Sequence, residues 1–303
     1  MPVSLLLSLI PIAHLTLPSP LGREAQAWFL GQIARHRPEL AQALHDVPGP
    51  KPYTVSGVTG DTWRVAGVGQ RLKPGERCWP RVTTLNDDLS GLVVEKILPN
   101  LPVRLTLRGM DFRIEGHTLN PADHPWAGQT TYGALVQAGE GGDRSRQIKL
   151  EFASPTAFRS EGADIPLPIP SHVFRGYWQK WNAFAPEPLR IQDTWPQFAA
   201  ACVMVSELTN VNTERWIFAN GARGAATGFT GRVGFTLLPR DQCGEWAAIW
   251  SGAAQVLRTL AEFAFYSGTG HHTTVGLGQT RPLTPGPSPV EKARQERGES
   301  VRS

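Results

Sequence analysis

The order in which apolar runs follow one another most constrains how this chain can fold. In the first half, strand-like and helix-like runs fall at 4–13, 22–46, 52–58, 63–68, 80–85, 87–96 and 103–119. The second half has a similar order at 146–155, 170–184, 202–219, 230–238, 243–268 and 277–283. Each half follows the β-α-β-β-α-β order of a ferredoxin-like unit, without obvious sequence repetition. The sequence thus predicts an α+β protein with two tandem ferredoxin-like (RRM-like) domains, residues 1–145 and 146–283.

Three segments need a separate interpretation. The start, "MPVSLLLSLIPIAHLTLP", has no Lys or Arg before its apolar stretch, which Pro2 and Pro11 bracket, so a buried first strand is expected instead of a signal peptide. Residues 120–146 are rich in Gly, Asp and Pro and predict an irregular connection. Residues 284–303 are Pro-rich and then charged, which predicts a disordered tail. No apolar run reaches the roughly 18 residues of a membrane span.

Charge and cysteine content leave the function class open. The chain has 30 Lys and Arg against 26 Asp and Glu, so its net charge of +4 permits a polyanionic partner without demanding one. Cys78, Cys202 and Cys243 lie far apart and form no CxxC pair, which argues against a cysteine zinc site or a disulfide framework. A reducing, cytoplasmic location and no cofactor are expected.

The stretch "FYSGTGHHTTVGLGQTRP" at 265–282 combines four glycines with two adjacent histidines. It contains no Walker A string, and Thr273 stands where a dinucleotide fingerprint would need glycine. Three interpretations stay open: a helix stop followed by a tight turn, a metal site at the histidines, and a loop whose exposed amides hold an RNA backbone. The candidate RNA-binding residues are Gly268, Gly270, His271, His272, Thr273, Gly276 and Gly278.

A second group of residues lies in "LAQALHDVPGPKPYTVSG" at 40–57. His45 ends a predicted helix, and the rigid Pro-Gly-Pro turn that follows is suited to holding Lys51 and Tyr53 close to it. An imidazole moves protons near neutral pH, and a fixed cation stabilises negative charge that develops on phosphorus. This pairing favours phosphodiester cleavage.

Four strings together, "ALHDVPGPKPYTVSG", "LEFASPTAF", "GFTGRVGF" and "FYSGTGHHTTVGLGQTRP", resemble the CRISPR-associated repeat-cleaving endoribonucleases, the Cas-six family. The resemblance implies a metal-independent cut within the repeat RNA of a CRISPR precursor transcript, which releases guide RNAs with 2′,3′-cyclic phosphate and 5′-hydroxyl ends. It implies that His45 is the acid-base residue, that Lys51 supports the phosphate, and that residues 268–278 lie between the domains and help to hold RNA. It also implies RNA as the main partner and CRISPR effector subunits as possible further partners.

One departure from the family pattern concerns the partner of the histidine. Several relatives carry a tyrosine in the first helix, whereas this helix offers Trp28 and Phe29. Either Tyr53 or His36 substitutes for it, or the 2′-hydroxyl is activated without a strong base, and His36 is also a rival acid-base residue. Two alternatives stay open: a non-catalytic RNA-binding subunit of an effector complex, and a metal-dependent hydrolase that uses His271 and His272. Further phosphate contacts are expected at Arg64, Arg71, Lys73, Arg77, Arg81, Arg223 and Arg232.

Overall fold

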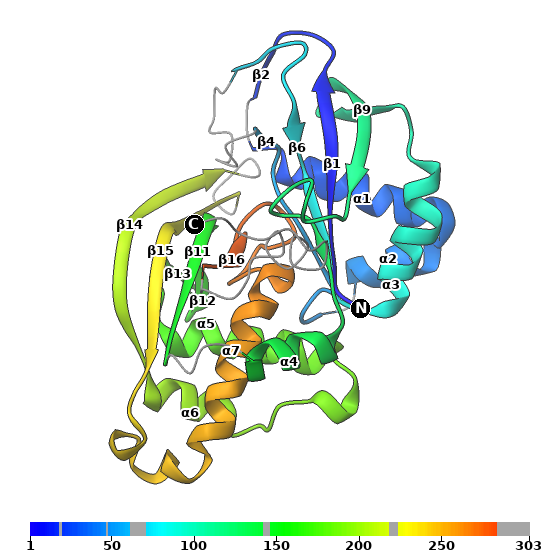
Figure 1. Cartoon of the computed structure of the whole chain (residues 1–303). Helices are drawn as coiled ribbons and strands as arrows, with labels where there is room; N and C mark the ends of the chain where they lie inside the picture. Colours follow the sequence, from blue (N-terminus) through cyan, green and yellow to red (C-terminus); the bar gives the residue numbers. More distant parts are fainter. Residues whose placement is uncertain (18–19, 47, 61–70, 142–145, 218–223, 284–303) are drawn as a thin grey trace, which may run out of the picture.

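The computed structural model describes residues 1–303 except 18–19, 47, 61–70, 142–145, 218–223 and 284–303. Two units of mixed helix and sheet pack side by side, and the predicted pair of ferredoxin-like domains is confirmed (Figure 1). The expected strand at 63–68 and the expected tail at 284–303 lie outside the described residues.

The first unit is built around β1 (Val3–Pro11), with β7 (Arg81–Thr84) on one side and β9 (Met110–Thr118) on the other. β3 (Tyr53–Val55) pairs with β7, so the order β3-β7-β1-β9 is that of a ferredoxin-like sheet. The helices are α1 (Gly22–His36), α2 (Pro38–Asp46) and α3 (Asp87–Leu92). The other strands are β2 (Leu15–Thr16), β4 (Thr59–Gly60), β5 (Arg71–Leu72), β6 (Cys78–Trp79), β8 (Arg104–Leu107) and β10 (Gly128–Gln129).

All of β1 is buried because both of its faces are covered. Leu5, Leu7 and Leu9 belong to the core that includes Phe29 of α1. On the opposite face, Leu6 packs with residues between the two units. The prediction of a buried first strand is therefore confirmed.

The second unit is built around β11 (Gln147–Thr156), in the sheet order β14-β15-β11-β16. Its remaining elements are β12 (Phe158–Ser160), β13 (Ala163–Ile165), α5 (Pro170–Phe184), α6 (Trp195–Cys202), β14 (Val203–Ile217), β15 (Ala225–Leu237), α7 (Trp250–Ser267) and β16 (Thr280–Pro282). Its aromatic core includes Phe152 of β11, Phe235 of β15, and Phe174 and Trp181 of α5. Among the described helices, none is long and apolar enough to cross a bilayer.

The prediction of an irregular connection at 120–146 is wrong in part, because α4 (Tyr132–Gly141) forms there. Figure 1 shows α4 beside α7, and Tyr132 and Leu135 are buried in the core of the second unit. Gly139 permits the close approach, since a Cβ there would lie 2.2 Å from Oγ1 of Thr259 on α7. Tertiary packing thus outweighs the low helix propensity of glycine.

Arg81 joins the two units and is not the surface phosphate contact that was predicted. Its side chain is buried between the rings of Trp126 and Phe265, whose centroids lie 5.0 and 4.4 Å from Cζ. The guanidinium donates to Oγ of Ser4 at 2.8 Å and to Oε1 of Gln279 at 2.9 Å. Burial lowers the pKa of Arg81 to about 9.

Candidate active site

His45 lies in the last turn of α2, on the face that points to solvent. Leu44 is buried against the core of the first unit, which leaves the neighbouring His45 side chain 76% exposed. Pro38 begins α2 at the position where a missing N–H costs least. Helix packing through Leu44 therefore presents His45 outward.

An acid and a cation lie next to His45. Nδ1 of His45 is 3.0 Å from Oδ1 of Asp46, and Nζ of Lys51 donates to the carbonyl oxygen of His45 at 3.3 Å. Gly49 has a φ of 99°, in the left-handed region that glycine tolerates, so the turn brings Lys51 back to the helix end. Hydrogen bonds from His45 and then Gln42 hold the pKa of Asp46 below its ordinary value. The sequence analysis did not single out Asp46, although its adjacency to His45 was a signal.

The two substitutes for the missing tyrosine are placed differently. Tyr53 is buried, its ring is 5.6 Å from that of Phe29, and its hydroxyl accepts a hydrogen bond from Nε2 of Gln26 at 3.0 Å. Burial raises the pKa of Tyr53, so the phenolate form that could accept a proton is scarce near pH 7. His36 is exposed at the end of α1, one helix before His45.

The glycine-rich loop (residues 268–278) ends α7 as predicted, with Gly268 in the cap position at φ 60°. Most of it is buried, and His272 is its one exposed residue. Six loop amides donate to protein carbonyls, those of residues 268, 269, 271, 275, 277 and 278. The expectation of a row of exposed amides is therefore wrong for these six residues.

Close packing explains two of the loop glycines directly. A Cβ on Gly270 would lie 2.2 Å from the carbonyl oxygen of Ala157, and one on Gly278 would lie 2.0 Å from that of Thr269. Both residues also have positive φ, 76° and 70°. The spacing of glycines reflects the fit of this loop against its neighbours.

The loop lies between the two units and contacts the strand that follows Lys51. The amide of Val55 in β3 donates to the carbonyl oxygen of Thr273 at 3.0 Å, and Ser56 forms a parallel bridge with Gly276. Lys51 precedes β3 by two residues. The two segments that the sequence analysis singled out thus meet through β3.

The two loop histidines face an acidic residue. Their ring centroids are 4.3 Å apart, and Nε2 of His271 lies 3.3 Å from Oδ1 of Asp164, without hydrogen-bond geometry. Burial lowers the pKa of His271 to about 4, so its ring is neutral at pH 7, and burial of part of the His272 ring lowers the pKa of that side chain too. Across the residues that the structure describes, no group of three or more His, Cys, Asp or Glu side chains is placed to hold a metal ion.

The remaining predicted phosphate contacts are scattered. Arg232 of β15 is exposed and lies 3.5 Å from Glu151, to which Arg281 also binds. Arg77 is exposed beside the ring of Trp79, with Cζ 5.8 Å from its centroid. Arg71 and Lys73 are exposed as well, whereas Arg64 and Arg223 lie outside the described residues.

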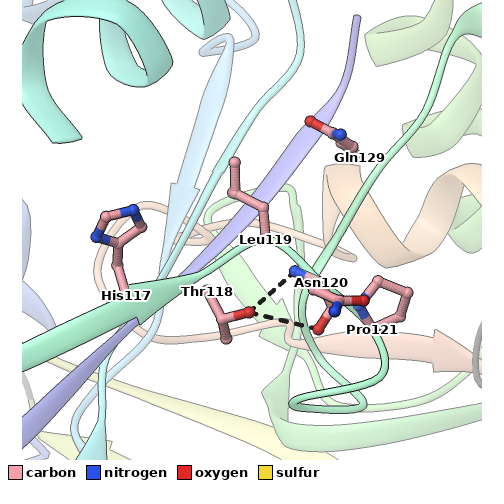
Figure 2. A pocket seen from close by; sticks show the side chains of 6 residues that line it. All are labelled: His117, Thr118, Leu119, Asn120, Pro121 and Gln129. Atoms are coloured by element: carbon pink, nitrogen blue, oxygen red, sulfur yellow. Dashed lines mark hydrogen bonds between the residues drawn. The ribbon is translucent and has the colours of Figure 1, made fainter. Parts of the chain in front are cut away.

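A groove follows β9 on the sheet face opposite α1. One hollow of about 400 Å³ is lined by residues 117–121 and Gln129, and Figure 2 shows the Thr118 hydroxyl bonded to the backbone of Asn120 there. A second hollow, of about 600 Å³, is also lined by His117 and Thr118, and its other lining residues include Arg77, Arg113 and Trp79. The predicted catalytic residues line neither hollow.

The fold and this site define a class: two ferredoxin-like units with an exposed histidine beside a lysine. Two protein-family models match this sequence. The one for the CRISPR Cas6 N-terminal domain matches residues 1–137, and the one for the CRISPR-associated endoribonuclease Cas6 matches residues 150–280. The chain therefore belongs to the Cas6 family.

Individual relatives agree with this assignment. The chain is 29% identical over 147 residues to a CRISPR-associated endoribonuclease Cas6 of Mycobacterium tuberculosis, a match that covers 46% of this chain and only 41% of that relative. The Cas6 (TTHB231) product complex has a TM-score of 0.75 and 26% identity over 93% of this chain and 100% of that one. For the Cas6 (TTHA0078) product complex these values are 0.70 and 28%, with 93% and 99% covered.

Proposed function

We propose that this protein is a metal-independent endoribonuclease that cuts CRISPR precursor transcripts within their repeats and so releases guide RNAs. Family membership supports this proposal, as do the structures of two similar proteins in complex with product. A histidine-to-alanine mutant of Cas6 (TTHA0078), 27% identical to this chain, is also among the similar structures.

The observation that carries the proposal is the placement of His45. Nδ1 of His45 faces Asp46, so the other ring nitrogen, Nε2, faces solvent. The His45 side chain is 76% exposed. A carboxylate that accepts from Nδ1–H fixes the orientation of the ring and leaves Nε2 as the nitrogen that exchanges a proton with a substrate. His45 is therefore suited to donate a proton from Nε2 to a substrate.

The reaction that fits this arrangement is attack by the RNA's own 2′-hydroxyl. The 2′-hydroxyl gives its proton to solvent water as its oxygen forms a bond to phosphorus. The bond from phosphorus to the 5′ oxygen breaks, and Nε2 of His45 gives its proton to that leaving oxygen. The products are a 2′,3′-cyclic phosphate and a 5′-hydroxyl. The nucleophile is already tethered, so alignment supplies much of the rate enhancement.

Lys51 has the complementary role of stabilising charge. Its ammonium is held at the carbonyl oxygen of His45, 3.3 Å away, so it is fixed next to the proton donor. Negative charge grows on the phosphoryl oxygens as the 2′ oxygen attacks, and a fixed cation lowers the barrier to that change. Because Tyr53 is buried, we assign it no part in deprotonating the 2′-hydroxyl.

We assign the groove along β9 to the RNA backbone. Arg77, Arg113 and His117 line it, and Trp79 offers an aromatic surface at its side. Glu115 also lines it and pairs with both arginines, at 3.3 and 2.9 Å, so a phosphate would compete with this carboxylate for them. Cationic side chains with an interleaved aromatic ring suit single-stranded RNA, and such binding weakens as salt is added.

The test is single-turnover cleavage of the host's repeat RNA in excess EDTA, with the product ends identified. We expect cleavage to persist in EDTA and to vanish when the nucleotide just 5′ of the cut lacks its 2′ oxygen, while binding changes little. A deoxy substitution one nucleotide further along is the matched control and should be tolerated. Cleavage of the deoxy substrate to a linear phosphate, or a need for metal, would favour the hydrolase that uses His271 and His272. Tight binding without any cleavage would indicate the non-catalytic effector subunit.

A further inference from the structure

Helix α5 sends a lysine into the glycine-rich loop. Nζ of Lys180 donates to the carbonyl oxygen of Ser267 at 2.6 Å, to that of Gly268 at 3.4 Å, and to Oγ1 of Thr273 at 3.4 Å. Ser267 is the last residue of α7, Gly268 caps it, and Thr273 is in the middle of the loop. One ammonium group therefore contacts the loop at its start and at its middle.

Packing alone does not account for a lysine at this position. The side chain is partly buried, and burial lowers the pKa of Lys180 to about 7, with no carboxylate offsetting that effect within the described part of the chain. A partly buried cation whose described partners are neutral oxygens costs free energy, which the C-terminal dipole of α7 offsets in part. An unbranched apolar side chain would fill the same space without that cost.

A second polar group on the same face of α5 also contacts the loop. The hydroxyl of Tyr177, one helical turn before Lys180, lies 2.6 Å from Oγ1 of Thr269, and both groups are buried. Residues three apart on a helix lie on one face. This face of α5 therefore holds the loop by directed hydrogen bonds as well as by apolar contact.

The loop residue that Lys180 holds is also the one that contacts the first unit. Oγ1 of Thr273 accepts from Lys180, and the carbonyl oxygen of Thr273 accepts from the amide of Val55. Val55 belongs to β3, which starts two residues after Lys51. A chain of contacts thus leads from α5 through the loop to the segment that carries Lys51.

We propose that Lys180 is a positioning residue, which fixes the glycine-rich loop against β3 and so holds Lys51, two residues before β3, in place beside His45. The inference rests on the proposed function. Lys180 does not touch the substrate; it acts through Thr273 and β3.

The test compares Lys180→Met, which keeps the length and removes the donor, with Lys180→Arg, which keeps charge and donors. Lys149→Met is the matched control, because Lys149 pairs with Glu207 at 2.6 Å and has no contact with the loop among the described residues. Three quantities are measured: the single-turnover rate at saturating repeat RNA, the Kd for that RNA, and hydrogen exchange of the amides of Thr269, Gly278 and Val55.

We expect Lys180→Met to slow cleavage at saturating RNA at least about tenfold, because small misplacements of catalytic groups are costly. The three amides should exchange faster in that variant, Lys180→Arg should recover most of the rate, and Lys149→Met should match the wild type. If Lys180→Met does not fold, Lys180→Gln goes through the same measurements with the same expected results.

Wild-type cleavage and wild-type amide exchange in folded Lys180→Met would overturn the inference. An equal loss of rate in Lys180→Arg and Lys180→Met would also overturn it. That result would show that the loss comes from the size and shape of the new side chain and not from the missing hydrogen bonds. If the wild-type protein itself leaves repeat RNA intact, the proposed function fails instead. The exchange measurement needs no RNA and still tests whether Lys180 fixes the loop.

Discussion

The His45 turn (residues 45–51) and the glycine-rich loop (residues 268–278) meet at β3 but are built in opposite ways. Residues 45, 46 and 48–50 of the turn are exposed, and its histidine contacts Asp46 and Lys51. The loop is mostly buried, and its amides bond to carbonyls of its own backbone and of residues 155, 157 and 264. Substitutions in the turn should therefore change chemistry and spare stability, whereas substitutions in the loop should do the reverse.

The largest expected effect is that of Gly270→Val on folding. The backbone there has a φ of 76°, and a Cβ would lie 2.2 Å from the carbonyl oxygen of Ala157. We expect a loss of more than about 4 kcal/mol in the free energy of unfolding, measured by urea denaturation. A variant that folds with wild-type stability would show that the loop backbone accommodates a side chain at residue 270. The contrast between the loop and the His45 turn would then be wrong.

Gly31→Ala is the matched control for the loop glycines. Gly31 lies in α1, and no atom comes within 4 Å of the Cβ position there. Alanine in a helix interior is favoured over glycine, so this variant should gain roughly 0.5–1 kcal/mol.

The second effect is that of His45→Ala on cleavage. Removing the proton donor should slow single-turnover cleavage by roughly 10², whereas repeat-RNA binding and the unfolding midpoint should change little, because the side chain is exposed. His36→Ala is the comparison variant and should cut at nearly the wild-type rate. If His36→Ala abolished cleavage and His45→Ala did not, His36 at the end of α1 would be the proton donor instead.

The third effect is the pH dependence of stability that His271 contributes. Its pKa is about 4 in the folded protein against an ordinary 6.5, so the unfolded chain binds more protons between those values. Stability should thus fall as pH drops from 6.5 toward 4, by about 2 kcal/mol after allowing for partial exposure. Urea unfolding at pH 7 and 4.5 should show this loss in the wild type and less of it in His271→Gln. Equal losses in both proteins would assign the pH dependence to other groups.

The smallest effect is expected at Lys51, the residue that links the turn to β3. Lys51→Met should lower the single-turnover rate about tenfold, because the cation stabilises developing charge at a site that water also reaches. Lys51→Arg should retain more activity than Lys51→Met. Equal rates in Lys51→Met and the wild type would leave His45 without the proposed partner.

The sequence predicted elements well where local pattern decides them. Gly268 ended α7 as predicted, because a glycine acts on the backbone at its own position. The sequence did not predict α4, because that helix depends on the packing of Tyr132 and Leu135 in the core of the second unit. Arg81 was misjudged for a similar reason, since its partners Phe265 and Gln279 are distant in sequence.

For the candidate site, the sequence showed which residues have suitable chemistry but not how deeply each is buried. His45 and Lys51 were found because a helix end and a rigid turn place them together locally. The burial of Tyr53 depends on Gln26 and Phe29, and that of the loop depends on Ala157 and Val55, contacts that no local pattern encodes. Lys180 was not singled out, because a lysine in a helix is ordinarily a surface residue.

The position of Arg81 has a consequence for biosynthesis. During translation Arg81 leaves the ribosome long before Phe265 and Gln279, which later enclose it. Before Phe265 and Gln279 are synthesised, the guanidinium of Arg81 and the ring of Trp126 have no second unit to cover them. Both groups are buried in the finished protein. A chain that terminates before residue 265 leaves both groups uncovered permanently.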